Sequence, residues 1–237
     1  MRWLILLALL PLFFVPPALA QDDEDEEIES CQSWPNVPIN IVTVFSEPKY
    51  DFDENMAAIQ SIASDRGHSL PEGIALGVTR YEPVLNFNVP TVVEDMPLGI
   101  TCAYIKHVDV AFGYEDLTVL IAHEVPQGSC GFEEILKHEQ KHVEVAHELL
   151  HKYAPIISEK LAEHLKVYGM SQASNPDYAQ QYLSDKLHDA VGDIVMQMEN
   201  ENIERQQQID TPAEYERLGT VCNGELATIT QQYMTKK

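Results

Sequence analysis

The chain has 237 residues, of which 38 are aspartate or glutamate and 15 are lysine or arginine, so its formal net charge at pH 7 is −23. Such an excess of negative charge repels phosphate groups, which argues against nucleic acid and against an anionic membrane surface as partners. A hydrophobic share of 45% in a chain of this length is enough for one domain with a sizeable core.

The first twenty residues have the composition of an export signal. An apolar run follows the single basic residue, Arg2, and Ala18-Leu19-Ala20 has the small-x-small pattern of a cleavage site. The run is too short for a confident membrane span, and no later stretch approaches about 20 apolar residues. We therefore expect residues 1–20 to be a signal peptide. The mature chain is then exported, periplasmic or secreted, without a stable membrane anchor.

An acidic run follows the expected cleavage site. Between Asp22 and Glu29 the sequence reads DDEDEEIE, and these like charges repel one another. We expect residues 21–30 to be a disordered arm, with weak calcium binding as the alternative interpretation. The remaining residues, 31–237, are expected to form a single domain.

The chain has four cysteines, Cys31, Cys102, Cys130 and Cys222. An even number of cysteines in an exported chain predicts two disulfides, and three pairings are possible. We favour Cys102 with Cys130 and Cys31 with Cys222, because two strand-like runs joined by a turn lie between Cys102 and Cys130. Zinc binding by cysteine is disfavoured, because no Cys-x-x-Cys spacing occurs.

Short β-type patterns dominate the first half of the expected domain. Residues 38–45 are typical of a strand, and residues 55–63 of a short helix that follows the cap-prone sequence DFDEN. Residues 73–89 carry two further strand-like runs, which Pro83 separates.

Residues 102–112 and 117–125 predict an antiparallel hairpin, because they are rich in β-branched and aromatic residues and residues 113–116 favour a turn. A strand at a sheet edge just before the next helix is where zinc peptidases commonly hold an extended substrate. His107 and His123 lie on these strands and could point to a site, although single histidines on strands are more often surface or satisfied core groups.

Residues 130–153 form an amphipathic helical pattern that contains the sequence HEQKH. At 100° per residue the apolar side chains fall in one arc of roughly 180°, and charged residues fill the other side. His138, Glu139 and His142 are the three ionisable residues within the apolar arc. Burying such groups without partners is costly, so their placement needs a physical reason.

A metal ion supplies that reason. Histidines four residues apart project from adjacent helical turns and can bind one Zn²⁺, while the glutamate beside the first histidine can act as general base on a water molecule. His138, Glu139 and His142 thus form the HExxH pattern of zinc peptidases. The alternative is a chance match in a helix that is rich in histidine, glutamate and lysine and packs on a polar groove.

A second long helix is predicted over residues 177–208, after Pro155 has kinked or restarted the first. Glu201 lies at the centre of its apolar stripe, with Arg205 beside it. We therefore predict Glu201 as the third zinc ligand, with Glu204 as the next choice, in a His₂Glu set that leaves a fourth position for water. The alternative is that Glu201 only pairs with Arg205.

Other polar residues of this half have a less defined place. His147 and His151 point roughly opposite to His138 on a continuous helix, and the glycine of the HExxHxxGxxH pattern is absent. An oxyanion needs a further hydrogen-bond donor. The candidates for that donor are Tyr153, Tyr182, Tyr215 and Arg205.

Residues 101–208 resemble a group of uncharacterised bacterial exported proteins that are described as secreted zinc-dependent proteases. The shared features are the cysteine-bounded strand pair, a Gly-Ser-Cys turn and HExxH at one point in the following helix. The resemblance implies a zincin-like fold, His138 and His142 as zinc ligands, and Glu139 as catalytic acid and base. It supplies no third ligand, and Ile-Asp-Thr around Asp210 matches only in part a Tyr-Asp and Thr pattern of some of these proteins.

The sequence thus predicts an α+β fold, with a small antiparallel sheet in the N-terminal half packed on long C-terminal helices. The expected function is that of an exported zinc-dependent metallopeptidase, which acts on a peptide or protein with Glu139 as general base. The alternative is a non-catalytic exported module that binds a protein or envelope component and carries a degenerate or chance HExxH motif.

Overall fold

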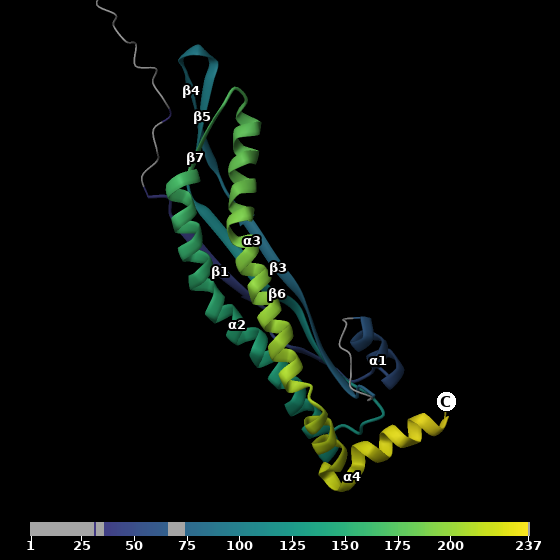
Figure 1. The fold of residues 1–237 in the computed structure, drawn as a ribbon. Helices are drawn as coiled ribbons and strands as arrows, with labels where there is room; N and C mark the ends of the chain where they lie inside the picture. The colour runs from purple at the N-terminus through teal and green to yellow at the C-terminus, as the bar shows by residue number, and fades with distance from the viewer. Residues whose placement is uncertain (1–30, 32–35, 66–73, 237) are drawn as a thin grey trace, which may run out of the picture. The chain divides into compact units, whose positions relative to one another are not determined.

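A computed structural model describes residue 31 and residues 36–65 and 74–236 (Figure 1). The expected signal peptide, residues 1–20, and acidic arm, residues 21–30, lie outside the described residues. The elements are β1 (Ile39–Phe45), β2 (Lys49–Asp51), α1 (Met56–Asp65), β3 (Gly77–Asn88), β4 (Thr91–Met96), the 3-10 helix η1 (Pro97–Gly99), β5 (Ile100–Ile105), β6 (Val108–Ile121), α2 (Cys130–Tyr168), β7 (Met170–Ala173), α3 (Pro176–Ile209) and α4 (Pro212–Lys236).

Most strands precede the long helices, which confirms the predicted α+β class. β6 is the centre of a four-stranded sheet, with β3 antiparallel on one side and β1 and β2 parallel to successive parts of the other side. A second, antiparallel sheet has the strand order β4-β5-β7. The first sheet is therefore mixed, and only the smaller one is antiparallel throughout.

The predicted hairpin is wrong, because its expected turn, residues 113–116, lies inside β6. Gly113, at φ 149°, comes so close to β1 that a side-chain carbon there would lie 1.9 Å from the carbonyl oxygen of Val44. Asp116, at φ 52°, is an extra residue where the register with β3 shifts. A β-bulge therefore accommodates the turn-forming residues without reversing the chain.

Pro83 also lies inside a strand instead of separating two. It is in β3, opposite Tyr114 of β6. β3 has β6 as its one strand partner among the described residues. Proline is tolerated in such an edge strand, because its missing N–H can face away from the partner. The short helix predicted at residues 55–63 is confirmed by α1.

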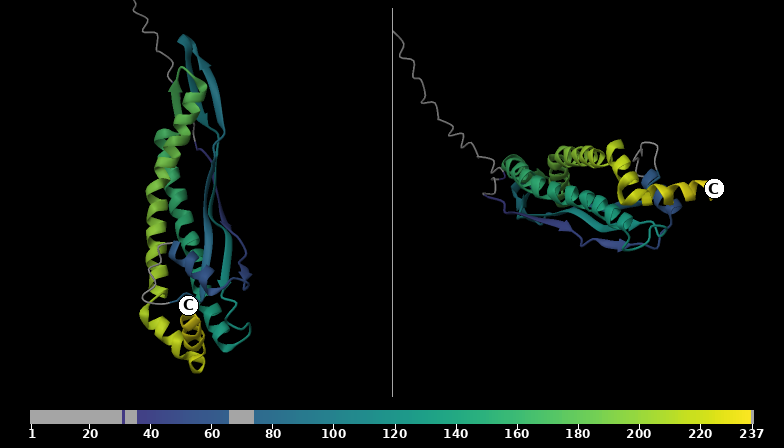
Figure 2. Two further views of the ribbon diagram at one scale, coloured as in Figure 1. Left: turned by 90° about the vertical axis from the view of Figure 1, so that its right-hand side faces the viewer. Right: turned by 90° about the horizontal axis from the view of Figure 1, so that it is seen from below.

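α2 and α3 lie side by side and cover one face of the four-stranded sheet (Figure 2). Ser129 caps α2 by accepting a hydrogen bond of 3.2 Å from the backbone N–H of Phe132. Pro155 lies within α2 and does not end it. Tyr153 and Ile157, two residues away on either side, are both buried in the core and hold this part of the helix in place. None of the helices in the described part of the chain combines the length and the apolar composition that a membrane crossing requires.

The main core lies between this sheet and the two long helices. Alternate side chains of β6 point into it, as the period of a strand requires, and they pack with the apolar stripes of α2 and α3. A second apolar cluster joins α1, the end of β6, the start of α2 and α4. The buried side chains that β6 gives to the main core are Val108, Val110, Phe112 and Tyr114.

Two disulfides are present, as predicted, but the favoured pairing is wrong. Cys31 is bonded to Cys102, and Cys130 to Cys222. Because the hairpin does not form, Cys102 in β5 and Cys130 at the start of α2 are separated by the whole of β6. Its 14 residues span roughly 45 Å at about 3.3 Å per residue. The first disulfide fastens the N-terminal segment to the smaller sheet, and the second fastens α2 to α4.

Candidate metal centre

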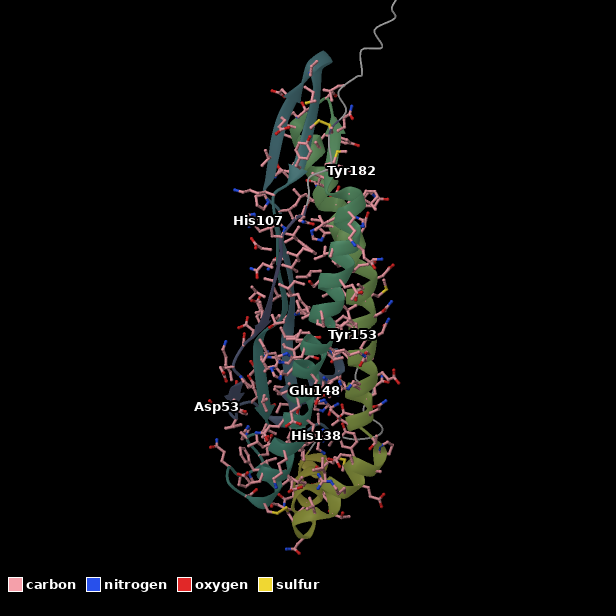
Figure 3. The ribbon with its side chains drawn as sticks, turned by 90° about the vertical axis from the view of Figure 1, so that its left-hand side faces the viewer. Asp53, His107, His138, Glu148, Tyr153 and Tyr182 are labelled. Atoms are coloured by element: carbon pink, nitrogen blue, oxygen red, sulfur yellow. A yellow bond between two sulfur atoms is a disulfide. The ribbon has the colours of Figure 1, made fainter. Side chains whose placement is uncertain are left out.

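The buried face of α2 carries His138, Glu139 and His142, whose exposed fractions are 4%, 4% and 8%. His138 lies beside the start of α4 (Figure 3). Asp210 comes from the junction between α3 and α4 and faces both histidines. Its Oδ1 lies 3.1 Å from His138 Nε2 and 3.3 Å from His142 Nε2, and the two Nε2 atoms are 3.3 Å apart. Two segments distant in the sequence therefore meet at three ligand-type atoms.

These three atoms form a nearly equilateral triangle of a size that suits a metal ion. A tetrahedral zinc ion with bonds of about 2.0–2.1 Å holds its ligand atoms roughly 3.3–3.4 Å apart. The observed edges of 3.1 to 3.3 Å match one face of such a tetrahedron. His138, His142 and Asp210 could thus hold a metal ion, with a fourth corner left for another ligand.

The second ring nitrogen of each histidine has its own acceptor. His138 Nδ1 lies 3.4 Å from Glu214 Oε1, and His142 Nδ1 contacts Gln206 Oε1. Gln206 Nε2 donates to the backbone oxygen of His142 at 3.2 Å, which turns the amide oxygen toward the ring. With both Nδ1 atoms protonated, both Nε2 atoms present lone pairs toward Asp210. Three acceptors this close repel one another unless a cation or a proton lies among them.

Electrostatics within the triangle favour a bound positive charge. Burial disfavours the charged form of His142, but the hydrogen bond with Asp210 and the charge of Glu139 outweigh it and raise the pKa of His142 to about 9. Burial acts to raise the pKa of Asp210, yet its hydrogen bonds with His138 and His142 hold that pKa far below its usual range. Without metal the triangle therefore keeps a proton near neutral pH, and a metal ion would replace that proton.

This proton gives the metal-free protein a predictable pH dependence. The pKa of His142 rises from 6.5 to about 9 on folding, so the stabilisation is complete below pH 6.5 and is lost as the pH rises through about 9. We expect the melting temperature, measured in chelator, to fall over this range and to fall less in His142→Gln. A parent curve that rises between these pH values, or matches that of His142→Gln, contradicts the expectation.

Glu139 is held by β3. Thr79 Oγ1 lies 2.9 Å from Glu139 Oε2 and 3.2 Å from the backbone oxygen of Glu139, so it donates to this residue. Burial raises the pKa of the Glu139 carboxyl, which brings it toward the range that suits a general base at neutral pH. Gly77 makes room beside it, since a side-chain carbon at that position would lie 2.6 Å from Glu139 Oε1.

The triangle and Glu139 line a cavity of about 600 Å³. Its volume is in the range of pockets that bind small ligands or parts of larger ones. The wall comes from α1, residues 74–79, α2, α3 and α4, and it is mostly apolar apart from the triangle, Glu139 and a few polar side chains of α3 and α4. The larger aliphatic side chains of this wall are Ile74, Leu76, Ile135, Ile203, Leu218, Leu226 and Met234.

Tyr215 is the one of the four predicted donors that lines this cavity. Its hydroxyl donates to Asp210 Oδ1 at 3.0 Å. Burial, followed by the charge of Asp210, raises the pKa of Tyr215 above its usual value, so the hydroxyl stays protonated. The others have partners elsewhere: Tyr153 donates to Glu201, Arg205 pairs with Glu148, and Lys186 lies over the ring of Tyr182.

The structure does not bring Glu201 to the histidines; the carboxylate that lies beside them, in a group that could hold a metal ion, is that of Asp210. Glu201 instead accepts hydrogen bonds from Lys152 and from Tyr153. The buried side of α3 continues from Met198 through Asn202 and Gln206 in steps of four residues, which leaves Glu201 beside it. The next choice, Glu204, is exposed.

The remaining histidines of interest are outside the cavity. His107 lies 3.2 Å from Asp109, and His123 lies 3.6 Å from Glu124. The sequence pattern did not reveal Asp210 as a member of the group that could hold a metal ion, nor Gln206, Glu214 and Thr79 as partners of the motif.

Comparison of the chain with protein-family models, with curated protein sequences and with solved structures gives no match. The class of site therefore follows from geometry alone. It is a buried group of two histidines and an aspartate that could hold a metal ion, beside a buried glutamate in a cavity.

Proposed function

We propose that the chain is an exported zinc-dependent metallopeptidase with a zincin-like site, in which His138, His142 and Asp210 hold the ion. The observation that carries this proposal is the triangle of three acceptor atoms next to buried Glu139. Two imidazoles and one carboxylate also suit iron(II). Zinc is favoured because the triangle has tetrahedral dimensions, and because hydrolysis needs the neighbouring base that Glu139 provides.

His138, His142 and Asp210 would hold the zinc ion, which would supply a Lewis acid to polarise a carbonyl group and to lower the pKa of a water molecule toward neutrality. Thr79 holds Glu139 Oε2, which leaves Oε1 to take a proton from the attacking water. As water adds to the carbonyl carbon and the C–N bond breaks, Glu139 delivers that proton to the leaving amine. The single hydroxyl proton of Tyr215 goes to Asp210 Oδ1 at 3.0 Å, so Tyr215 would stabilise the oxyanion only by turning from that carboxylate to the substrate.

β3 provides an edge for an extended peptide. The carbonyl oxygen of Leu76 accepts a hydrogen bond of 2.8 Å from Ala122 N–H, next to β6. Alternation along the strand then points the backbone groups of Gly77 and Thr79 away from β6, toward the outer edge of the sheet, while Glu139 lies over the face on the side of the Thr79 side chain. A peptide added at this edge would lie beside the strand that holds Glu139. The strand is β3, not the one directly before α2, because β6 is central in its sheet.

The two disulfides fit export, since such bonds form and persist in oxidising compartments. We propose a periplasmic or secreted location. A non-catalytic module remains the competing hypothesis, and it differs in one testable respect: a binding module has no use for a buried base beside the metal ligands.

The test is cleavage of unfolded proteins by the zinc-loaded chain, read by mass spectrometry of new peptide termini. We expect cleavage that stops with chelator and returns with added zinc. A chain that carries one zinc ion per molecule and produces no new termini from a broad set of unfolded proteins contradicts the peptidase and supports the binding module.

Gly77→Ala tests the close approach of β3 to the base. The added carbon would lie 2.6 Å from Glu139 Oε1 and 2.7 Å from Ile135 Cγ2, so the carboxylate must move. Displacement of a catalytic group by about 1 Å can cost on the order of 10²-fold, and we expect a loss of that size in kcat/KM with the metal retained. The matched control is Gly192→Ala on the exposed side of α3, where no atom lies within 4 Å and activity should persist.

A further inference from the structure

A second pair of histidines lies on the exposed side of α2. His147 and His151 are four residues apart, and their Nε2 atoms are 3.1 Å from each other. Their rings are perpendicular, with centroids 4.5 Å apart. The separation of the Nε2 atoms is close to the 3.3 Å between the corresponding atoms of His138 and His142. The two imidazoles thus stand at a distance at which both can bind one ion.

The helix and a neighbouring ring hold this pair in place. Ala146 and Leu150, each adjacent in the sequence to one of the two histidines, are fully buried and fix this turn of α2 against the core. The ring of His147 packs on Phe45 of β1, with centroids 4.8 Å apart. The pair is therefore pre-arranged, and less conformational freedom is lost when an ion binds.

This pair is separate from the cavity. His147 and His151 each follow their counterpart in the HExxH motif by nine residues. On an α-helix that spacing corresponds to about 13–14 Å along the axis and to a rotation of about 180°. The pair consequently faces away from Asp210 and cannot share an ion with the cavity group.

We propose that His147 and His151 form a second, surface site for a divalent transition-metal ion. Imidazole nitrogen suits zinc, nickel and copper(II), and copper(II) should bind most tightly of the three. With two protein ligands, the remaining positions are filled by water, so the ion binds more weakly than in the cavity. The proposal does not depend on the peptidase function.

The first test is retention of the untagged full chain on immobilised Ni²⁺, which reaches exposed histidines only. The parent should be retained, and His147→Ala and His151→Ala should each elute at markedly lower imidazole. His142→Ala, which alters the buried group, should elute with the parent. So should His123→Ala, because the His123 side chain is 55% exposed but has no histidine near it in the sequence. Elution of the His147→Ala and His151→Ala variants with the parent overturns the proposal.

A calorimetric measurement in solution tests the site without the resin. In a calorimetric titration with Ni²⁺ of the zinc-loaded chain, dialysed first to remove weakly held zinc, we expect one site, weakened at least about tenfold in either single variant, because each histidine raises the effective concentration of the other. Circular dichroism verifies that the variants are folded. Equal Ni²⁺ affinity in the parent and in His151→Ala means that the imidazoles only hydrogen-bond to each other, and this refutes the site.

Discussion

Replacing Glu139 by glutamine is expected to lower the rate of peptide hydrolysis by about 10²–10⁴-fold, the contribution that a general base usually makes. Glutamine has nearly the same shape, and its side-chain oxygen can still accept the hydrogen bond from Thr79. It cannot take a proton from water. Because Glu139 is outside the triangle of ligand atoms, the variant should bind zinc as the parent does.

The matched control is Glu144→Gln, which changes an exposed glutamate on the same helix and should leave the rate unchanged. Both rates are measured on one cleavable peptide, with zinc content determined on the same samples. A Glu139→Gln variant that keeps its rate within about twofold removes Glu139 from the mechanism. One that loses its zinc would instead make Glu139 a ligand.

The second large effect concerns the disulfide between Cys130 and Cys222. It closes a loop with a sequence separation of 92 residues, so chain entropy predicts about 4–5 kcal/mol of stabilisation, and measured losses for native disulfides are about 2–5 kcal/mol. It joins the start of α2 to the non-helical residues Val221–Gly224 of α4. We expect the double serine variant to lose stability of this size in urea unfolding. It should also bind zinc more weakly, because Glu214 of α4 contacts His138 and Tyr215 of α4 contacts Asp210.

The disulfide between Cys31 and Cys102 is the control. Its sequence separation of 71 residues predicts a similar loss of stability. It belongs to the cluster of the smaller sheet and not to the cavity. Its double serine variant should therefore keep the zinc affinity of the parent under conditions in which both variants are folded. Equal zinc affinity in the two disulfide variants contradicts the role assigned to α4.

Sequence reasoning succeeded where a local period carries the information. The apolar arc of α2 placed His138, Glu139 and His142 on its buried side, and all three are buried. It failed where a single residue overrides the local pattern. The bulge at Asp116 turned an expected hairpin into one strand, and the wrong disulfide pairing followed directly from that hairpin.

Asp210, the third residue of the group around the two histidines, could not be predicted from helical periodicity. It lies just after α3, at a junction whose position depends on how α4 packs. A local signal was nevertheless present. Thr211 accepts a hydrogen bond from the N–H of Glu214, so Thr-Pro marks the start of α4. Two polar residues on the buried side of α3, Asn202 and Gln206, were a further sign that this end of the helix faces a polar site.

The central claim is that Asp210 completes a metal site with His138 and His142. The most direct test is the zinc content of the purified chain by elemental analysis, in the parent and in Asp210→Ala and Glu201→Ala, after dialysis that removes weakly held ions. We predict about one zinc ion per chain in the parent and in Glu201→Ala, and almost none in Asp210→Ala. A parent that holds no zinc after reloading, or a loss in Glu201→Ala but not in Asp210→Ala, would contradict the claim.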